Sequence, residues 1–271
     1  MATALINGIN VFYEEKGNPH SKNVVLFLNG VMASTSSWNF QVPVFEKLDF
    51  RIVLHDFRGQ LKSDKPLGPY SFKQHALDTI ALMDQLNIDS AHLIGTSYGG
   101  EVAMKTAIEH PNRVKSLSII DSVSELDAVL TTFVSGWKAI AQTKDGERFF
   151  KQMLPSIYSD TYLRNNAEML AQRAKAMNTM PASYLEGQIA LYDTFIGDVT
   201  MTSDLTKINC PTLVVCGEND ILKPRKFSQI IVDQIKNSEF LIIPDCGHVT
   251  IFEKPDALNS ALLGFIIKQS A

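Results

Sequence analysis

The 271-residue chain is 45% hydrophobic and 20% charged, which is enough apolar material for a large core and excludes a wholly disordered protein. Its 25 Lys and Arg against 29 Asp and Glu give a net charge of −4, so no basic excess points to nucleic acid. No apolar run approaches the ~18 residues of a membrane span, and the N-terminus lacks the features of a signal peptide. The length suits one α/β unit with an inserted segment.

The three cysteines, Cys210, Cys216 and Cys246, are too few and too scattered for a disulfide framework, and no pair has the spacing of metal ligands. We therefore expect reduced thiols in a cytoplasmic protein.

The first predicted elements are two strands at 5–7 and 10–14, which flank Gly8 and predict an antiparallel hairpin at a sheet edge. Apolar strands without in/out alternation then alternate with segments of helical periodicity. The predicted strands are Val24–Leu28, Arg51–His55, 91–94, Val114–Ile120, 211–216 and 239–243, and the predicted helices are 72–86, 98–110, 224–235 and 256–267. This alternation predicts a mostly parallel, doubly wound α/β sheet with helices on both faces.

Residues 122–203 interrupt the alternation, because they show helical patterns at 149–154 and 167–177 and no clear strand. We interpret them as a helical cap inserted into a core domain that comprises residues 1–121 and 204–271. Five of the nine methionines lie in this segment. Methionine suits a surface that packs against a ligand, although packing of the cap onto the core explains the methionines equally well. The methionines of the segment are Met153, Met169, Met177, Met180 and Met201.

The sequence Gly95-Thr96-Ser97-Tyr98-Gly99 lies between a predicted strand and a predicted helix. G-x-S-x-G in that setting is a nucleophile elbow, in which a strained turn exposes the serine hydroxyl and glycines avoid collisions two positions away. Ser97 is therefore the candidate nucleophile, at a helix N-terminus that favours a developing anion.

A serine hydroxyl needs a base, and the base needs an acid that fixes its tautomer. Of the six histidines, His248 follows the last strand, at the sheet edge where α/β proteins place their sites. Asp220 follows the preceding strand on the same edge, and Asp121, at the end of Val114–Ile120, is its competitor. The order Ser97, Asp220, His248 is the one expected of α/β-hydrolases.

The oxyanion that forms on attack needs fixed donors. We expect one to be the backbone N–H of Tyr98, after the nucleophile. The other should come from Asn29-Gly30-Val31-Met32, and Val31 is our choice because Gly30 lets the chain turn so that the next N–H faces the serine.

Together these motifs resemble the α/β-hydrolase superfamily over nearly the whole chain. Asp56-Phe57-Arg58-Gly59-Gln60 with Ser63-Asp64-Lys65-Pro66 is similar to that family's D-x-R-G-x-G-x-S-x-x-P loop, and Cys246-Gly247-His248 to its base segment. The chain departs from the family pattern at Asn29, where the family has His, and at Leu61, where it has Gly. We expect Asn29 to brace the oxyanion loop and Leu61 to reshape the loop near the pocket entrance.

The resemblance implies acyl transfer to water without metal or cofactor. Ser97 excludes haloalkane dehalogenases and epoxide hydrolases, which use aspartate at that position. A carboxylic ester, lactone or thioester fits, and the loops look most like those of enol-lactonases and small esterases. Carbon–carbon bond hydrolases and proline iminopeptidase-like enzymes stay open, the latter with Asp160, Glu168 and Asp193 as candidate acidic cap residues. A receptor of this fold is the alternative of another class.

Aromatic residues of the cap predict a large apolar cavity between cap and sheet, suited to a bulky hydrophobic ester or a macrocyclic lactone. The mild negative charge favours a neutral substrate over a polyanion. We expect a monomer or homodimer whose partner is this small molecule, with no nucleic acid or membrane involved. The expected pocket residues are Gly30, Met32, Trp137, Met177 and Phe195.

Overall fold

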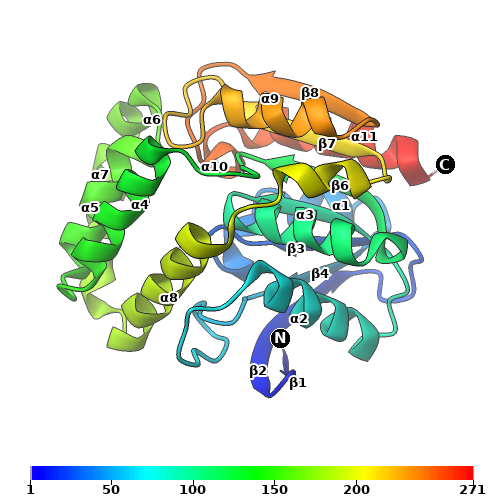
Figure 1. Ribbon diagram of the computed structural model, residues 1–271, viewed down its shortest axis with the longest axis horizontal. Helices are drawn as coiled ribbons and strands as arrows, with labels where there is room; N and C mark the ends of the chain where they lie inside the picture. Colours follow the sequence, from blue (N-terminus) through cyan, green and yellow to red (C-terminus); the bar gives the residue numbers. More distant parts are fainter. Residues whose placement is uncertain (1, 271) are drawn as a thin grey trace.

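The computed structural model describes residues 2–270 (Figure 1), and their strands form one eight-stranded sheet in the order β1-β2-β4-β3-β5-β6-β7-β8. Strands β1 and β2 form the predicted edge hairpin, in which Ile6 pairs with Ile9, and β2 also runs antiparallel to β4. Strands β3 to β8 pair in parallel, which confirms the mostly parallel sheet. The bounds are β1 (Ala2–Ile6), β2 (Ile9–Gly17), β3 (Val24–Leu28), β4 (Arg51–His55), β5 (Ala91–Thr96), β6 (Val114–Ile120), β7 (Thr212–Gly217) and β8 (Ser238–Ile243).

Helices cover both faces of the sheet, so its strands are apolar on both sides. In β3, Leu26 and Leu28 pack into a core with residues of α2 (Phe72–Gln85), α3 (Tyr98–Glu109) and α9 (Arg225–Gln234). The alternate residues Val25 and Phe27 pack into a second core on the other face. That core includes residues of α1 (Val42–Glu46) and α11 (Pro255–Ser270).

Five helices between β6 and β7 gather beside the sheet in Figure 1, and we call this helical segment the cap. Side chains mark where several of them begin, since Asp127, Asp145 and Ser159 each accept a hydrogen bond from a backbone N–H of the first helical turn. The cap helices are α4 (Ala128–Ala141), α5 (Gly146–Ile157), α6 (Asp160–Asn165), α7 (Ala167–Ala176) and α8 (Ala182–Asp198).

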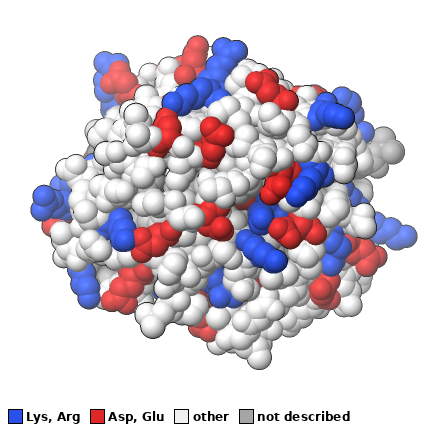
Figure 2. Space-filling view, in the orientation of Figure 1, with Lys and Arg blue, Asp and Glu red and all other residues white. Residues whose placement is uncertain are grey.

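Short elements complete the fold and were not predicted, because segments of three to six residues are too short to display a period. They are the helical turns η1 (Thr35–Trp38), η2 (Pro111–Arg113), η3 (Met177–Thr179) and η4 (Thr202–Lys207) and the helix α10 (Thr250–Glu253), in addition to α1. No helix within residues 2–270 is both long enough and apolar enough to cross a bilayer. On the face shown in Figure 2, acidic and basic side chains are interspersed.

Candidate active site

Ser97 occupies a sharp turn between the end of β5 and the start of α3. Its φ of 51° lies in the left-handed region, which a non-glycine residue rarely adopts. The turn brings backbones so close that a Cβ on Gly95 would overlap the carbonyl of Gly99, and one on Gly99 would overlap the carbonyl of Leu28. The glycines flanking Ser97 are therefore a steric requirement of the turn.

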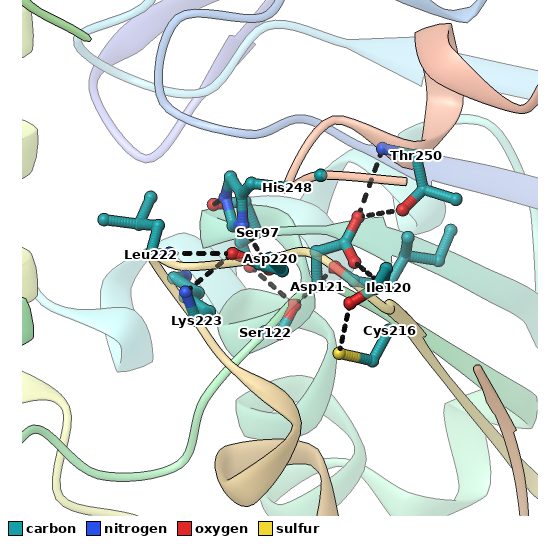
Figure 3. A network of polar contacts seen from close by, with 12 residues as sticks. Ser97, Ile120, Asp121, Ser122, Cys216, Asp220, Leu222, Lys223, His248 and Thr250 are labelled. Carbon is teal, nitrogen blue, oxygen red and sulfur yellow. Dashed lines mark hydrogen bonds and ion pairs between the residues drawn. The ribbon is translucent and has the colours of Figure 1, made fainter. Parts of the chain in front are cut away.

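Ser97, His248 and Asp220 form a continuous hydrogen-bonded chain (Figure 3). His248 Nε2 lies 3.0 Å from Ser97 Oγ, and His248 Nδ1 lies 2.8 Å from Asp220 Oδ2. Asp220 Oδ1 accepts the backbone N–H groups of Leu222 at 2.9 Å and Lys223 at 2.8 Å, which fixes the carboxylate plane. Asp220 follows β7 and His248 follows β8, so the sheet brings these loops together at the carboxyl end of β5.

Asp121, the competing acid, is fully buried and directed at other groups. Its Oδ1 accepts the N–H of Gly217 at 3.0 Å, and its Oδ2 accepts both the N–H and the hydroxyl of Thr250 (Figure 3). Burial, followed by the nearby Asp220 carboxylate, raises the pKa of Asp121 well above its usual range. Asp121 thus holds together the end of β7 and the start of α10, the segments that flank Asp220 and His248.

The loop after β3 lies directly against Ser97, because a Cβ on Gly30 would be 3.4 Å from Ser97 Cβ. Asn29 Nδ2 donates to the carbonyl of His55 at 2.8 Å and to Gln60 Oε1 at 3.1 Å, and Gln60 Nε2 donates to the carbonyl of Gly30 at 2.7 Å. These bonds brace the loop that carries the Val31 N–H. The Tyr98 N–H begins α3 and has no acceptor within that helix.

A buried ion pair anchors the loop after β7, which carries Asp220. Lys223 Nζ lies 2.9 Å from Glu101 Oε1 in α3, and both side chains are almost wholly excluded from solvent. Burial raises the pKa of Glu101, and the Lys223 cation opposes that rise. The ion pair joins the loop that carries Asp220 to the helix that begins after Ser97.

A cavity of about 270 Å³ lies between the cap and the sheet edge and opens onto Ser97 and His248. This volume is close to the lower end of the roughly 300–1,000 Å³ typical of ligand pockets. Its walls are mainly apolar and aromatic. The lining residues from the cap are Trp137, Phe150, Met153, Ile157, Tyr158, Arg173, Ala176, Met177, Met180 and Tyr184.

Four of the five predicted pocket residues, Gly30, Met32, Trp137 and Met177, line this cavity. Phe195 instead borders a smaller space of about 20 Å³, which Ser97, Val31 and Trp137 also line, so it lies next to the site but outside the main cavity. Leu61 packs against the core rather than lining the cavity. Sequence reasoning did not place Phe150, Met153, Ile157, Arg173 or Met180 in the pocket. A helical period marks a buried face but does not say whether that face meets protein or a cavity.

The segment that carries His248 is also bonded to the cap. The His248 N–H donates to the carbonyl of Ile157, the last residue of α5, at 3.0 Å. Glu253 accepts the N–H of Gly247 at 3.1 Å and the N–H of Ser159 at 3.2 Å. The α5–α6 junction of the cap is therefore held to the loop after β8.

Within residues 2–270, no group of three or more His, Cys, Asp or Glu side chains is arranged to hold a metal ion. The three cysteines are free, and burial raises the pKa of each thiol.

Residues 23–255 match the family model described as alpha/beta hydrolase fold, and the chain therefore belongs to that family. It is 27% identical to a Caulobacter sp. (strain K31) protein provisionally named carbamate hydrolase RutD, with both chains covered completely. It is 24% identical to 3-oxoadipate enol-lactonase 2 of Acinetobacter baylyi, over 88% of this chain and 86% of that one. The solved structure of MGS-M2, an alpha/beta hydrolase enzyme from a deep-sea metagenome library, superposes with a TM-score of 0.92 at 26% identity, covering 97% and 96% of the two chains.

Proposed function

We propose that the protein is a serine hydrolase that cleaves a carboxylic ester or lactone through an acyl-enzyme on Ser97. The observation that carries the proposal is the hydrogen-bonded series Ser97–His248–Asp220 at the floor of an apolar cavity. Such a series activates a weak hydroxyl nucleophile, because the base accepts its proton while the acid stabilises the resulting imidazolium.

In the proposed reaction, Ser97 Oγ attacks the carbonyl carbon while its proton passes to His248 Nε2. The N–H groups of Val31 and Tyr98 stabilise the oxyanion. Collapse of the tetrahedral intermediate expels the alcohol oxygen, which takes the proton from His248. A water molecule then attacks the acyl-enzyme with His248 as base, releasing the acid and restoring the serine.

The cavity also bears on the substrate. Among the described residues that line it, none is Asp or Glu, which disfavours a peptidase that binds a free amino group. Its volume favours a small or medium-sized ester or lactone over the bulky or macrocyclic substrate expected from the cap's aromatic content. The names of two relatives, carbamate hydrolase and enol-lactonase, denote hydrolysis at a carbonyl that bears an oxygen or nitrogen substituent, which supports the proposed chemistry.

Labelling by a fluorophosphonate probe, combined with a panel of esters, lactones, thioesters and carbamates, tests the proposal. We expect the native protein to be labelled and to hydrolyse at least one ester or lactone, and Ser97→Ala to lose both properties. Ser37→Ala is the matched control, because Ser37 also lines the cavity and should retain both. A native protein that is neither labelled nor active would overturn the enzyme proposal in favour of a receptor.

A further inference from the structure

Arg173 is the one residue of the types Lys, Arg, Asp and Glu among the described residues that line the cavity. It lies on α7, and its spacing from Ala176 at the end of α7 and from Met177 at the start of η3 places all three on the cavity side. Arg173 is exposed, whereas His248 is buried and Ser97 is half-buried, so Arg173 lies toward the open end of the cavity. The cavity thus has a nucleophile at one end and a cation at the other.

The guanidinium is held in place by aromatic rings. Its Cζ lies 5.8 Å from the ring centroid of Phe150 and 5.7 Å from that of Phe252, and both of these residues line the same cavity. Rings at these distances attract a cation and limit the rotamers of a long side chain. The positions of α5, α7 and α10 therefore fix the Arg173 head group before any ligand arrives.

No Asp or Glu among residues 2–270 forms an ion pair with Arg173, and the nearby acidic side chain of Glu253 is bonded to the backbone N–H groups of Ser159 and Gly247. The neighbouring cap arginine Arg164 differs, because it pairs with Asp160 one turn away. A guanidinium presents a planar fork of five N–H donors that fits a carboxylate. Tyr158 forms a side-chain hydrogen bond with this guanidinium, and no carboxylate among residues 2–270 is paired with it.

We propose that the substrate carries a carboxylate at the end remote from its scissile carbonyl, and that Arg173 binds this carboxylate. This inference rests on the proposed function, since it names the class of ester or lactone that the site takes. A half-ester of a dicarboxylic acid or a lactone with a carboxylate side chain has this form. The hydrocarbon segment between the carboxylate and the scissile carbonyl of such a substrate would contact the walls between Arg173 and Ser97, which Met and Tyr side chains line. The net charge of −4 favours a neutral substrate. At the cavity itself, however, the cation of Arg173 determines which charge on a substrate is attracted.

Methyl half-esters of the C4 to C8 dicarboxylic acids test the inference against the corresponding methyl esters with a terminal carboxamide. The carboxamide keeps the shape and removes the charge. We expect the wild type to favour the carboxylate by about 10- to 100-fold in kcat/KM at its best chain length. Arg173→Met should abolish this preference and leave the carboxamide ester within about threefold, while Arg173→Lys should retain part of it.

Arg148→Met is the matched control, because Arg148 is an exposed cap arginine outside the cavity, and the preference should survive in it. Quenching of tryptophan fluorescence by free adipate gives a readout that needs no turnover, since Trp137 lines the cavity. Adipate should bind the wild type and Arg148→Met at least tenfold more tightly than Arg173→Met.

Equal hydrolysis of carboxylate and carboxamide esters would overturn the carboxylate inference while leaving the serine hydrolase proposal intact. So would an equal loss on both substrates in Arg173→Met. Absence of probe labelling and of all hydrolysis would instead overturn the proposed function. The adipate titration then decides the Arg173 site by itself, because equal affinity for the wild type and Arg173→Met would overturn it.

Discussion

Lys223 and Glu101 form a buried ion pair, 2.9 Å between Nζ and Oε1, that ties the loop carrying Asp220 to the helix that begins after Ser97. Glu101 also accepts the N–H of Val123, where the chain leaves β6 toward the cap. The pair therefore connects three segments that meet at the site, although neither side chain belongs to the hydrogen-bonded series itself.

Removal of one partner should be far more costly than removal of both. Glu101→Gln leaves the Lys223 cation buried without its counter-charge, and we expect the free energy of unfolding to fall by about 3–5 kcal/mol. The double variant Glu101→Leu with Lys223→Met should recover most of that loss, because it leaves no uncompensated buried charge. Urea unfolding of the single and double variants measures the difference. A single variant within about 1 kcal/mol of the wild type would contradict this account.

The two buried acids at the site should respond differently to the same substitution. Asp220→Asn removes the acceptor of the His248 Nδ1 proton, and we expect kcat to fall by about three to four orders of magnitude while the fold is kept. Asp121→Asn should leave kcat within about fivefold, because Asp121 bonds Gly217 and Thr250 rather than His248. Steady-state kinetics with circular dichroism compares them. A largely active Asp220→Asn protein would assign the acid role to Asp121.

The steric need for glycine in the elbow is tested by Gly99→Ala. A Cβ at this position would overlap the backbone of Leu28 and Asn29, which cannot move aside, so we expect loss of soluble protein or a fall in stability of more than about 3 kcal/mol. A Cβ at Gly136, on the exposed face of α4, would meet nothing within 4 Å, so Gly136→Ala should stabilise the protein by up to about 1 kcal/mol. Thermal unfolding measures both; a native-like melting temperature for Gly99→Ala is incompatible with the packing described.

His75 should make the protein sensitive to acid. Burial, with the neighbouring Arg58 and His55, lowers the pKa of His75 from 6.5 to about 3. The unfolded chain therefore takes up a proton near pH 6.5, whereas the folded protein takes it up only near pH 3. The stability due to the neutral imidazole is complete above pH 6.5 and is lost as the pH falls toward 3, by about 1.4 kcal/mol per pH unit.

The variant His75→Gln isolates this effect, because acids with raised pKa values, such as Asp121 and Glu101, change stability in the opposite direction with pH. Both proteins share those acids. The difference in unfolding free energy between wild type and His75→Gln should shift against the wild type as the pH is lowered from 6.5 to 4.5. A difference that stays constant over this range would show that His75 does not titrate as described.

Much of the fold could be predicted from the sequence, because apolar strands buried on both faces and intervening helices have distinct patterns. The strands β3, β4 and β6 begin and end at the predicted residues. The elbow at Ser97 was also predictable, since G-x-S-x-G between a strand and a helix is a local pattern. Gly95 meets Gly99 four residues on, whereas the contact of Gly99 with Leu28 could be seen only in the folded sheet. The choice between Asp121 and Asp220 as the partner of His248 could be made only from the tertiary structure. Asp121 and Asp220 both follow parallel strands, and only the path of the loop after β7 places Asp220 against His248.

The cap was less predictable, because its helical periods do not specify how each helix is rotated about its axis. Trp137 and Phe195 look alike as aromatic residues of cap helices. Both border the small space beside Ser97, but only Trp137 also lines the main cavity. The same difficulty applies to the polar residue Arg173, because the sequence does not show whether it faces solvent or the cavity. A charged residue on a helix is ordinarily solvated, and only its placement between Phe150 and Phe252 at the cavity mouth distinguishes it.

The bond from the His248 N–H to the carbonyl of Ile157 has a mechanical consequence. A cap that swung open as a rigid flap at the α5–α6 junction would pull His248 away from Ser97, and each opening would disassemble the hydrogen-bonded series. The turn η3 is bonded to α5 as well, since the Glu147 N–H donates to Asn178 Oδ1 at 2.9 Å. Motion of α5 relative to the sheet would therefore displace His248 together with the cavity walls.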